Sequence, residues 1–274
     1  MPDVSLRLEA VSHVFYPGTA SEVTALDHVD LALEAGTFTV VLGTNGSGKS
    51  SLLNAIAGNL ALGGGRVYLD GREVTHWTEQ RRARLVSRVF QNPFTGTASD
   101  LSVAENLVLA GRRGGQRWLR QGLGRDRRRA IREKVAQLGM GLEDRLDTPM
   151  GMLSGGQRQA LTVLMATMVR PTLLLLDEHT AALDPRSAEQ VIKLTQGAIT
   201  AGGLTTLMVT HSMTQAVQLG DRVLVMHRGR VMYDLGDVRR RRLTEDNLLQ
   251  LFDQLRWADR LDDSAAEMLR RAYV

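Results

Sequence analysis

The stretch Gly43-Thr44-Asn45-Gly46-Ser47-Gly48-Lys49-Ser50 decides the fold of this chain. It fits the pattern G-x-x-x-x-G-K-[ST], follows an apolar strand candidate at Phe38 to Leu42 and precedes a helical pattern at Ser51 to Ala57. Glycines let consecutive backbone N–H groups and the positive end of the next helix face one anion-sized hollow. Lys49 adds a compact charge for the β and γ phosphates. The stretch therefore predicts nucleotide binding rather than a glycine-rich loop without a ligand.

Length and composition exclude several classes of protein. The 274 residues are 43% apolar and 23% charged, which is typical of a globular chain and excludes intrinsic disorder. The absence of cysteine excludes disulfides, thiolate metal sites and thiol nucleophiles. No apolar run reaches the roughly 18 to 20 residues that cross a bilayer, and the N-terminus has no signal-peptide layout. We expect a cytoplasmic protein that lies against a membrane at most.

A second apolar run ends in two carboxylates. Thr172 to Leu176 follows Pro171 and reads as a buried parallel strand with Asp177 and Glu178 at its C-terminal edge, where α/β sheets bind ligands. Adjacent residues of a strand end point in different directions, so Asp177 can hold Mg²⁺ while Glu178 reaches an attacking water. An acidic strand end that merely starts a loop is the alternative, and the presence of the phosphate-binding stretch weakens it.

The third pattern is Leu153-Ser154-Gly155-Gly156-Gln157, which precedes the helical pattern Arg158 to Val169. Ser154 and Gln157 form a capping box, and an ordinary helix start is the simplest interpretation. The two glycines lower helix stability and leave N–H groups and the helix dipole available to an outside anion. Because one phosphate cradle already exists, we predict that this helix start holds the γ-phosphate of an ATP bound to a second copy of the chain.

These three patterns, in this order, resemble those of ABC-type ATPases, the ATP-binding subunits of transporters, over about residues 4 to 235. The resemblance implies an α/β fold with a RecA-like P-loop NTPase core of parallel strands (1–91 and 159–235), an antiparallel β subdomain and a helical insert (92–158). Within this plan, Asp70-Gly71 and Arg228-Gly229 mark hairpin turns, and Ser102-x-x-Glu105 caps a helix. Residues 236–274 form a C-terminal helical tail with a cap candidate at Thr244.

The resemblance also assigns single residues. Tyr16 is similar to the aromatic residue that stacks on adenine, although Phe15 competes for that role and a half-buried strand tyrosine is the structural alternative. Gln91 resembles the glutamine that touches Mg²⁺ and the attacking water. Asp184 resembles the loop aspartate at the dimer seam, and His211 the histidine that contacts the γ-phosphate. A strand-end histidine is otherwise more often structural.

Together, the residues and the resemblance give three candidate sets. The catalytic set is Lys49, Gln91, Glu178 and His211, and the metal set is Ser50, Gln91 and Asp177. The set that binds ATP is Tyr16, Gly43, Thr44, Asn45, Gly46, Ser47, Gly48, Lys49, Ser50, Ser51, Ser154, Gly155, Gly156, Gln157 and Asp184. ATP and Mg²⁺ are the expected cofactors.

One position departs from the family. Most such subunits have proline after the two carboxylates, whereas this chain has His179. An imidazole beside the catalytic carboxylate leads to the hypothesis that hydrolysis is pH-sensitive, which the pH–rate profile of His179→Pro tests. A tolerated surface substitution is the alternative.

The basic residues are concentrated in a few places. The segment Arg112 to Lys134 carries nine Arg and one Lys against Asp126 and Glu133, a local charge of +8 in a chain of net charge +4, and a second run is Arg239 to Arg242. A basic surface spread over the whole molecule, which nucleic-acid binding favours, is not indicated. The first segment is expected to form a glycine-broken excursion near acidic headgroups or permease loops, or a plain solvated face.

The expected machine is an ATPase at the cytoplasmic face of the bacterial inner membrane. A homodimer or a pair of ATPase subunits closes around two ATP·Mg²⁺ and drives a separate integral-membrane permease, which is served by a periplasmic or lipoprotein solute-binding protein. The phrases around Gln91, Leu142 and Glu178 resemble a bacterial subgroup for amino-acid uptake, of the tryptophan/tyrosine or branched-chain type. Export or lipoprotein release is one alternative, and a soluble ABC protein of DNA repair or translation is the other. We expect no nucleic-acid partner.

Overall fold

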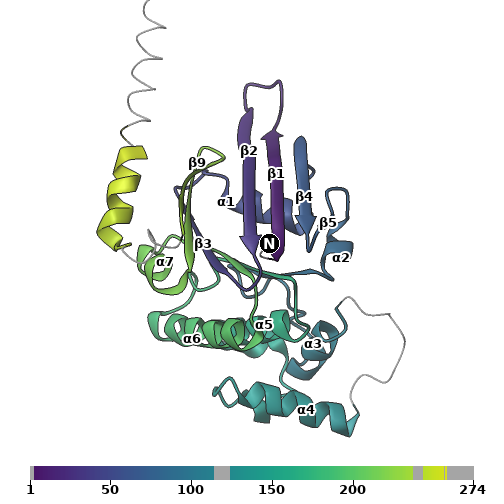
Figure 1. The fold of residues 1–274 in the computed structure, drawn as a ribbon. Helices are drawn as coiled ribbons and strands as arrows, with labels where there is room; N and C mark the ends of the chain where they lie inside the picture. The colour runs from purple at the N-terminus through teal and green to yellow at the C-terminus, as the bar shows by residue number, and fades with distance from the viewer. Residues whose placement is uncertain (1–2, 114–123, 237–242, 256, 258–274) are drawn as a thin grey trace, which may run out of the picture.

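The computed structural model describes residues 3–113, 124–236, 243–255 and 257, and it contains two sheets (Figure 1). The larger sheet has six strands in the order β10-β9-β3-β8-β7-β6. Its strands are β3 (Phe38–Gly43), β6 (Val86–Val89), β7 (Leu173–Asp177), β8 (Thr206–Val209), β9 (Arg222–His227) and β10 (Arg230–Leu235). All neighbouring pairs are parallel except β9 and β10. Val209 pairs with both Val41 and Asp177, so β3, β7 and β8 end at one edge.

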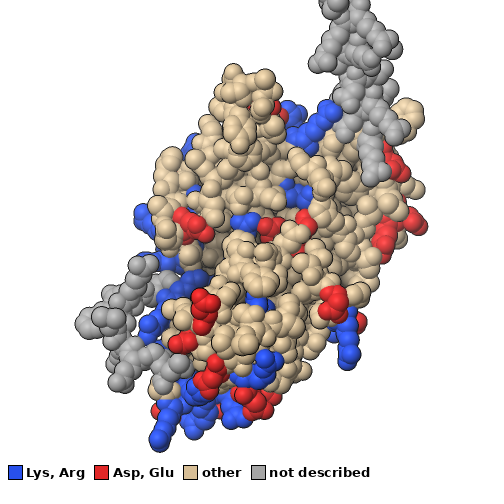
Figure 2. Space-filling view, turned by 180° about the vertical axis from the view of Figure 1, so that it is seen from behind, with Lys and Arg blue, Asp and Glu red and all other residues tan. Residues whose placement is uncertain are grey.

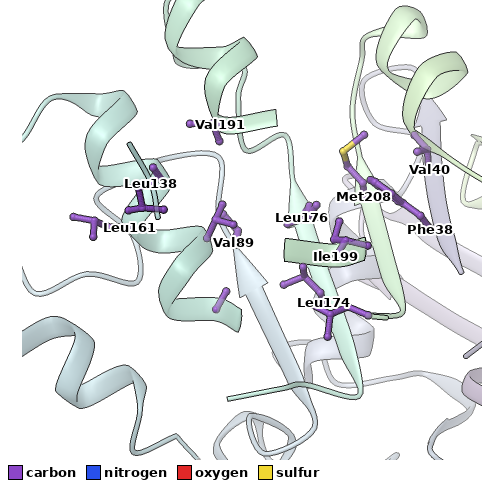
Figure 3. Packing of buried hydrophobic residues seen from close by; sticks show 14 of the residues in the cluster. Phe38, Val40, Val89, Leu138, Leu161, Leu174, Leu176, Val191, Ile199 and Met208 are labelled. Carbon is purple, nitrogen blue, oxygen red and sulfur yellow. The ribbon is translucent and has the colours of Figure 1, made fainter. Parts of the chain in front are cut away.

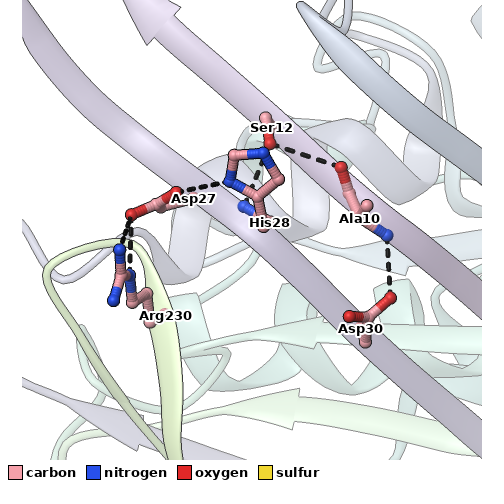
Figure 4. Close-up of polar contacts among 6 residues, drawn as sticks. All are labelled: Ala10, Ser12, Asp27, His28, Asp30 and Arg230. Carbon is pink, nitrogen blue, oxygen red and sulfur yellow. Dashed lines mark hydrogen bonds and ion pairs between the residues drawn. The ribbon is translucent and has the colours of Figure 1, made fainter.

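The smaller sheet is antiparallel, in the order β2-β1-β4-β5. It consists of β1 (Val4–Phe15), β2 (Val23–Glu34), β4 (Gly64–Leu69) and β5 (Arg72–Glu73). β1 and β2 lose register at bulges, where Ala10 and His28 adopt positive φ angles of 46° and 47°. Side chains satisfy the freed backbone groups: Ala10 N donates to Asp30 Oδ1 at 2.8 Å and His28 N to Ser12 Oγ at 3.0 Å (Figure 4).

The two sheets enclose the helix that follows the phosphate-binding stretch. α1 (Lys49–Ala57) buries Leu52, Leu53 and Ile56 among apolar residues of both sheets, such as Leu6 and Leu175. Asp27 ties the sheets together at their surface, because its carboxylate accepts from Arg230 Nε at 2.6 Å and contacts His28 Nδ1 at 2.7 Å (Figure 4). These two partners hold the pKa of the Asp27 carboxyl below its usual value.

The remaining helices include α5 (Gly155–Thr167) and α6 (Pro185–Gly202), which pack on the other face of the larger sheet. The others are α2 (Glu79–Arg82), α3 (Val103–Ala110), α4 (Arg125–Ala136) and α7 (Met213–Leu219), with 3₁₀ turns η1 (Leu142–Asp144) and η2 (Met150–Met152) and a helix over 245–255. Of these, α2 lies beside the smaller sheet (Figure 1). In the core, Leu161 of α5 and Val191 and Ile199 of α6 pack with strand residues such as Leu174 and Leu176 (Figure 3). The buried residues of α6 are spaced four apart and lie on one face of the helix, which explains this packing.

Among the described residues, the strands and helices predicted around the three patterns form, with ends shifted by a few residues; most of the predicted tail 236–274 lies outside the described residues. The hairpin turns at Asp70-Gly71 and Arg228-Gly229, the Ser102–Glu105 capping box and the Thr244 cap are confirmed. α4 lies at the lower end of the molecule, where Lys and Arg side chains alternate with Asp and Glu (Figures 1 and 2). Arg239 to Arg242 and residues 114–123 of the basic segment lie outside the described residues. Among the residues described, no helix is long and apolar enough to cross a membrane.

Candidate functional site

The phosphate-binding stretch is packed so tightly that glycine is required at both of its ends. A Cβ on Gly43 would lie 2.5 Å from the Met226 carbonyl oxygen, and a Cβ on Gly48 would lie 2.4 Å from that of Ala25. Gly48 also has a φ of 100°, which side chains disfavour. Gly229, in the β9–β10 turn, donates its N–H to Ser47 O at 3.0 Å. The loop is therefore held between β2 and this turn, with its amides preorganised.

Lys49 begins α1 and is almost completely buried. Its Nζ donates to the carbonyl oxygens of Gly43 and Thr44, both at 2.8 Å. Burial lowers the pKa of Lys49, and the charges of Glu178 and Asp177 oppose that shift. The ammonium thus spans the loop and lies within electrostatic reach of the two carboxylates at the end of β7.

Asp177 ends β7, and an arginine of the neighbouring strand holds its side chain. Arg88 of β6 donates from Nη2 to Asp177 Oδ2 at 2.6 Å, and from Nη1 to Asn54 Oδ1 of α1 at 2.7 Å. Within the described part of the chain, Asp177 Oδ1 accepts no hydrogen bond. One carboxylate oxygen is therefore engaged and the other is available.

Glu178 is held in an unusual backbone conformation. Its φ is 44°, in the left-handed region that non-glycine residues enter rarely, and its N–H donates to Val209 O of β8 at 2.9 Å. His211 Nε2 lies 2.6 Å from Glu178 Oε1. Such strained residues occur often at functional sites, and here the strain directs the carboxylate toward an imidazole that follows the next strand.

The other phosphate-side candidates lie in the loop, in α1 and after β6. Ser50 lies in the first turn of α1, beside Lys49, and is exposed. Gln91 follows β6 and is exposed, and among the described residues no hydrogen bond links it to Asp177 or Glu178. Thr44, Asn45 and Gly46 lie in the loop, where Gly46 has a φ of 77°. Ser51 continues α1.

The second predicted anion site has its capping box. Ser154 Oγ accepts from Gln157 N at 3.3 Å, and Gln157 Oε1 accepts from Ser154 N at 3.3 Å. Gly156 has a structural role that the sequence did not suggest, because a Cβ there would lie 2.7 Å from Ser187 Cβ. Asp184 is exposed and caps α6, since its Oδ1 accepts from Ser187 N at 3.1 Å. Hydrogen bonds from Ser187, first from its side chain and then from its N–H, lower the pKa of Asp184.

Tyr16 is free to meet a flat ligand. Its side chain is 68% exposed, it follows the last residue of β1 and it has a φ of 53°. The alternative of a half-buried strand tyrosine is therefore wrong. Phe15, whose ring centroid lies 6.4 Å away, is 37% exposed and packs edge-on against His13. Of the two aromatic residues, Tyr16 offers the larger open face.

Comparisons with known proteins identify the family. The model of the family described as ABC transporter matches residues 26–181. The chain belongs to the ABC transporter family. A tyrosine transport ATP-binding protein of Clostridioides difficile is 38% identical over 248 residues, which cover 90% of this chain and 98% of that protein. An energy-coupling factor transporter ATP-binding protein of Symbiobacterium thermophilum is 37% identical over 81% of this chain and 75% of its own length.

Solved structures agree with this assignment. A dimeric ATP-binding cassette bound to ADP and Pi, in a post-hydrolysis state, has a TM-score of 0.71 and 26% identity, covering 84% of this chain and 97% of that chain. A nucleotide-free cassette from an ABC transporter has a TM-score of 0.69 at 25% identity, covering 87% and 94%. The chain is thus an ATP-binding, ATP-hydrolysing subunit of the ABC transporter class, and the predicted family and fold are confirmed.

His179 of this ABC ATPase differs from both interpretations of its sequence position. Its side chain is 2% exposed, so a surface substitution is wrong. Its Nε2 lies 3.3 Å from Thr195 Oγ1, whose hydroxyl donates to Val191 O, so the imidazole is the donor. Burial lowers the pKa of His179 to about 4. An imidazole that is neutral at physiological pH and turned toward α6 gives no reason for pH-sensitive hydrolysis near neutrality.

Two residues near the site of this ABC ATPase were not predicted. One is Arg88, whose place in an apolar strand was the only available signal. The other is Phe252 of helix 245–255, which lines a hollow of about 460 Å³ with loop residues Gly43 to Asn45, His211 and Met213. The helical pattern of the tail was visible, but its contact with the phosphate loop depends on tertiary packing.

Proposed function

We propose that this chain is the ATPase subunit of an importer for amino acids or a similar small solute. Two copies, or two paired ATPase subunits, close around two ATP·Mg²⁺ and drive a separate permease at the cytoplasmic face of the membrane. The relatives described above are named for tyrosine transport and for energy-coupling factor transport, and this supports import. In this proposal residues 1–91 and 159–235 form the ATPase core, 92–158 the helical subdomain and 236–274 the tail.

The observation that carries the catalytic assignment is the pair His211–Glu178. The two side chains approach to 2.6 Å at the ends of β7 and β8, beside the buried Lys49. Glu178 is the proposed general base that orients the attacking water, and His211 keeps its carboxylate in place and contacts the γ-phosphate. Lys49 compensates charge that spreads over the phosphate oxygens in the loose transition state.

The donors near the end of β7 fit Mg²⁺. Among the described residues, no cluster of three or more His, Asp or Glu side chains could hold a metal alone. Mg²⁺ typically takes one or two protein oxygens together with substrate phosphates and waters, which suits Asp177 Oδ1, the Ser50 hydroxyl and Gln91. Bound there with ATP, Mg²⁺ would neutralise charge on the β and γ phosphates.

Dimerisation follows from the two separate anion sites. The α5 N-terminus and the phosphate loop are two separate candidate anion sites, and one ATP needs both in this proposal. We place the γ-phosphate of the partner's nucleotide at Ser154, Gly155 and Gly156, with Asp184 at the seam and Tyr16 on adenine. The dimeric form of the cassette with bound ADP and Pi supports this arrangement.

Glu178→Gln tests the catalytic assignment. A general base contributes about 10²- to 10⁴-fold, so we expect ATP turnover to fall by at least 100-fold. ATP affinity, measured by fluorescence titration, and ATP-dependent dimerisation, measured by light scattering, should persist, because Gln keeps the size of Glu. Glu189→Gln, at an exposed position of α6, is the control for the same carboxylate-to-amide change. Wild-type turnover in Glu178→Gln would refute the assignment.

Transport is tested with the same variant. Tagged Glu178→Gln protein is purified with ATP from gently solubilised membranes of its own cell, and its permease is identified and reconstituted with wild-type subunit. Uptake of radiolabelled tyrosine, tryptophan or branched-chain amino acids, dependent on ATP and on a solute-binding protein, supports the proposal. Outward movement of solute would replace it with export, and co-purification of ribosomes or nucleic acid without a permease would refute it.

A further inference from the structure

Arg88 is a buried cation that the mechanism above does not use. It lies in β6, the strand next to β7, and its side chain is 12% exposed, while that of Asp177 is 15% exposed. A surface ion pair contributes little because water and salt screen it, but a pair at this depth has a fixed geometry. We therefore asked what the position of this guanidinium does to the carboxylate that it contacts.

Three contacts fix the guanidinium of Arg88. Its Nη1 donates to Asn54 Oδ1 at 2.7 Å, its Nη2 to Asp177 Oδ2 at 2.6 Å, and its Cζ lies 4.8 Å from the centroid of the Phe90 ring. Its Nε is buried and has no partner among the residues that the structure describes. The fork of the guanidinium is planar and rigid, so a group anchored on α1 and on an aromatic ring presents Nη2 in one direction only.

We propose that Arg88 is a positioning residue for the metal site. By holding Oδ2, it sets the rotation of the Asp177 carboxylate and leaves Oδ1 as the oxygen for Mg²⁺. The contact to Asn54 fixes that orientation relative to α1, the helix that also carries Lys49 and Ser50. This inference rests on the proposed role of Asp177 as a metal ligand.

An orienting role of Arg88 and a purely electrostatic role predict opposite changes in metal affinity when Arg88 is removed, which makes the inference testable. If Arg88 acted only through its positive charge, its removal would strengthen the attraction between Asp177 and a divalent cation. If it acts by orientation, its removal weakens metal binding, as loss of the groups that hold metal ligands typically does by about 10- to 100-fold. We expect the second outcome.

The experiment measures metal affinity rather than turnover. Mn²⁺ replaces Mg²⁺ and is titrated into the full-length protein with a non-hydrolysable ATP analogue, and free Mn²⁺ is read by electron paramagnetic resonance. We expect about 10-fold weaker Mn²⁺ binding in Arg88→Met and in Arg88→Lys, which keeps the charge and loses the fork. Asn54→Ala should weaken binding in the same direction but less. Affinity for the analogue in EDTA should change by less than about twofold in all three, because no metal is present.

Two controls separate the possible failures. Arg113→Met removes another largely buried arginine, which donates to Ala166 O and Val169 O away from the site, and it should lower the thermal midpoint without changing Mn²⁺ affinity. Asp177→Ala tests the metal assignment itself. If Asp177→Ala binds Mn²⁺ as tightly as wild type, the proposed metal site fails. If only Asp177→Ala weakens binding, or if Arg88→Met tightens it, the positioning role of Arg88 is overturned.

Discussion

Because His179 is buried, we predict that this single residue contributes a loss of folding free energy at acidic pH. In the unfolded chain the imidazole has its ordinary pKa near 6.5, and in the folded protein burial lowers that pKa to about 4. Below pH 6.5 the unfolded state therefore takes up a proton that the folded state does not. The stability contributed by the neutral imidazole is complete above pH 6.5 and is lost as pH falls from 6.5 toward 4.

The pKa difference sets the magnitude. Each pKa unit corresponds to about 1.4 kcal/mol, so the loss of folding free energy from this residue is about 2 kcal/mol at pH 5 and about 3 kcal/mol at pH 4. The matched variant is His179→Gln, whose amide can also donate to Thr195 Oγ1 and does not titrate. Because other groups titrate alike in both proteins, the difference between them isolates His179.

Urea unfolding at pH 7.5, 6.0 and 5.0, followed by circular dichroism, measures this difference. We expect the wild type to lose about 2 kcal/mol more than His179→Gln between pH 7.5 and 5.0. Two parallel curves of unfolding free energy against pH would refute the reasoning.

The same burial predicts the pH dependence of catalysis. Above pH 6, the pH–rate profiles of ATP hydrolysis for wild type and His179→Pro should superimpose, since the imidazole stays neutral.

Three further predictions follow from single contacts. Arg82 is buried and donates to Ala55 O, Ile56 O and Thr75 O, so Arg82→Met should lower the free energy of unfolding by about 3 kcal/mol in urea, whereas Arg81→Met, its exposed neighbour, should change it by less than about 1 kcal/mol. Gly156→Ala should destabilise the protein by about 1–3 kcal/mol, because the added Cβ would lie 2.7 Å from Ser187. Gly155→Ala should be tolerated, because the nearest atom to its added Cβ lies 3.5 Å away, and equal thermal midpoints of the two variants would contradict this. Tyr16→Ala should weaken ATP binding about tenfold by calorimetry, with Tyr16→Phe near wild type, and unchanged binding would exclude adenine stacking.

Local patterns made much of the fold predictable. The stretch Gly43 to Ser50 carries its own strand, loop and helix signals, and the parallel strand before Asp177 is a continuous apolar run. Capping boxes at Ser102 and Ser154 depend only on residues three apart, so they were predicted correctly. Because each of these signals is short in range, no knowledge of the tertiary structure was needed.

What escaped prediction depends on contacts between distant residues. Arg88 and Asp177 are 89 residues apart, and the sequence pattern of β6 does not indicate which partner the long arginine side chain contacts. For His179 the sequence left open a titrating imidazole beside Glu178 or a surface substitution, but the residue is buried against Thr195 of α6. Phe252 lines a hollow with the phosphate loop only because helix 245–255 lies beside α7 (Figure 1).

Two cations, Arg88 and Lys49, lie near the carboxylates at the end of β7. Asp177 and Glu178 are adjacent carboxylates on a mostly buried edge, which would repel an incoming polyphosphate if they were uncompensated. Arg88 pairs with Asp177, and Lys49, whose pKa is lowered by burial against the opposing charges of the two carboxylates, adds a second cation. His211 Nε2 contacts Glu178 Oε1 at 2.6 Å. In the proposed mechanism, these contacts orient both carboxylates before nucleotide binds.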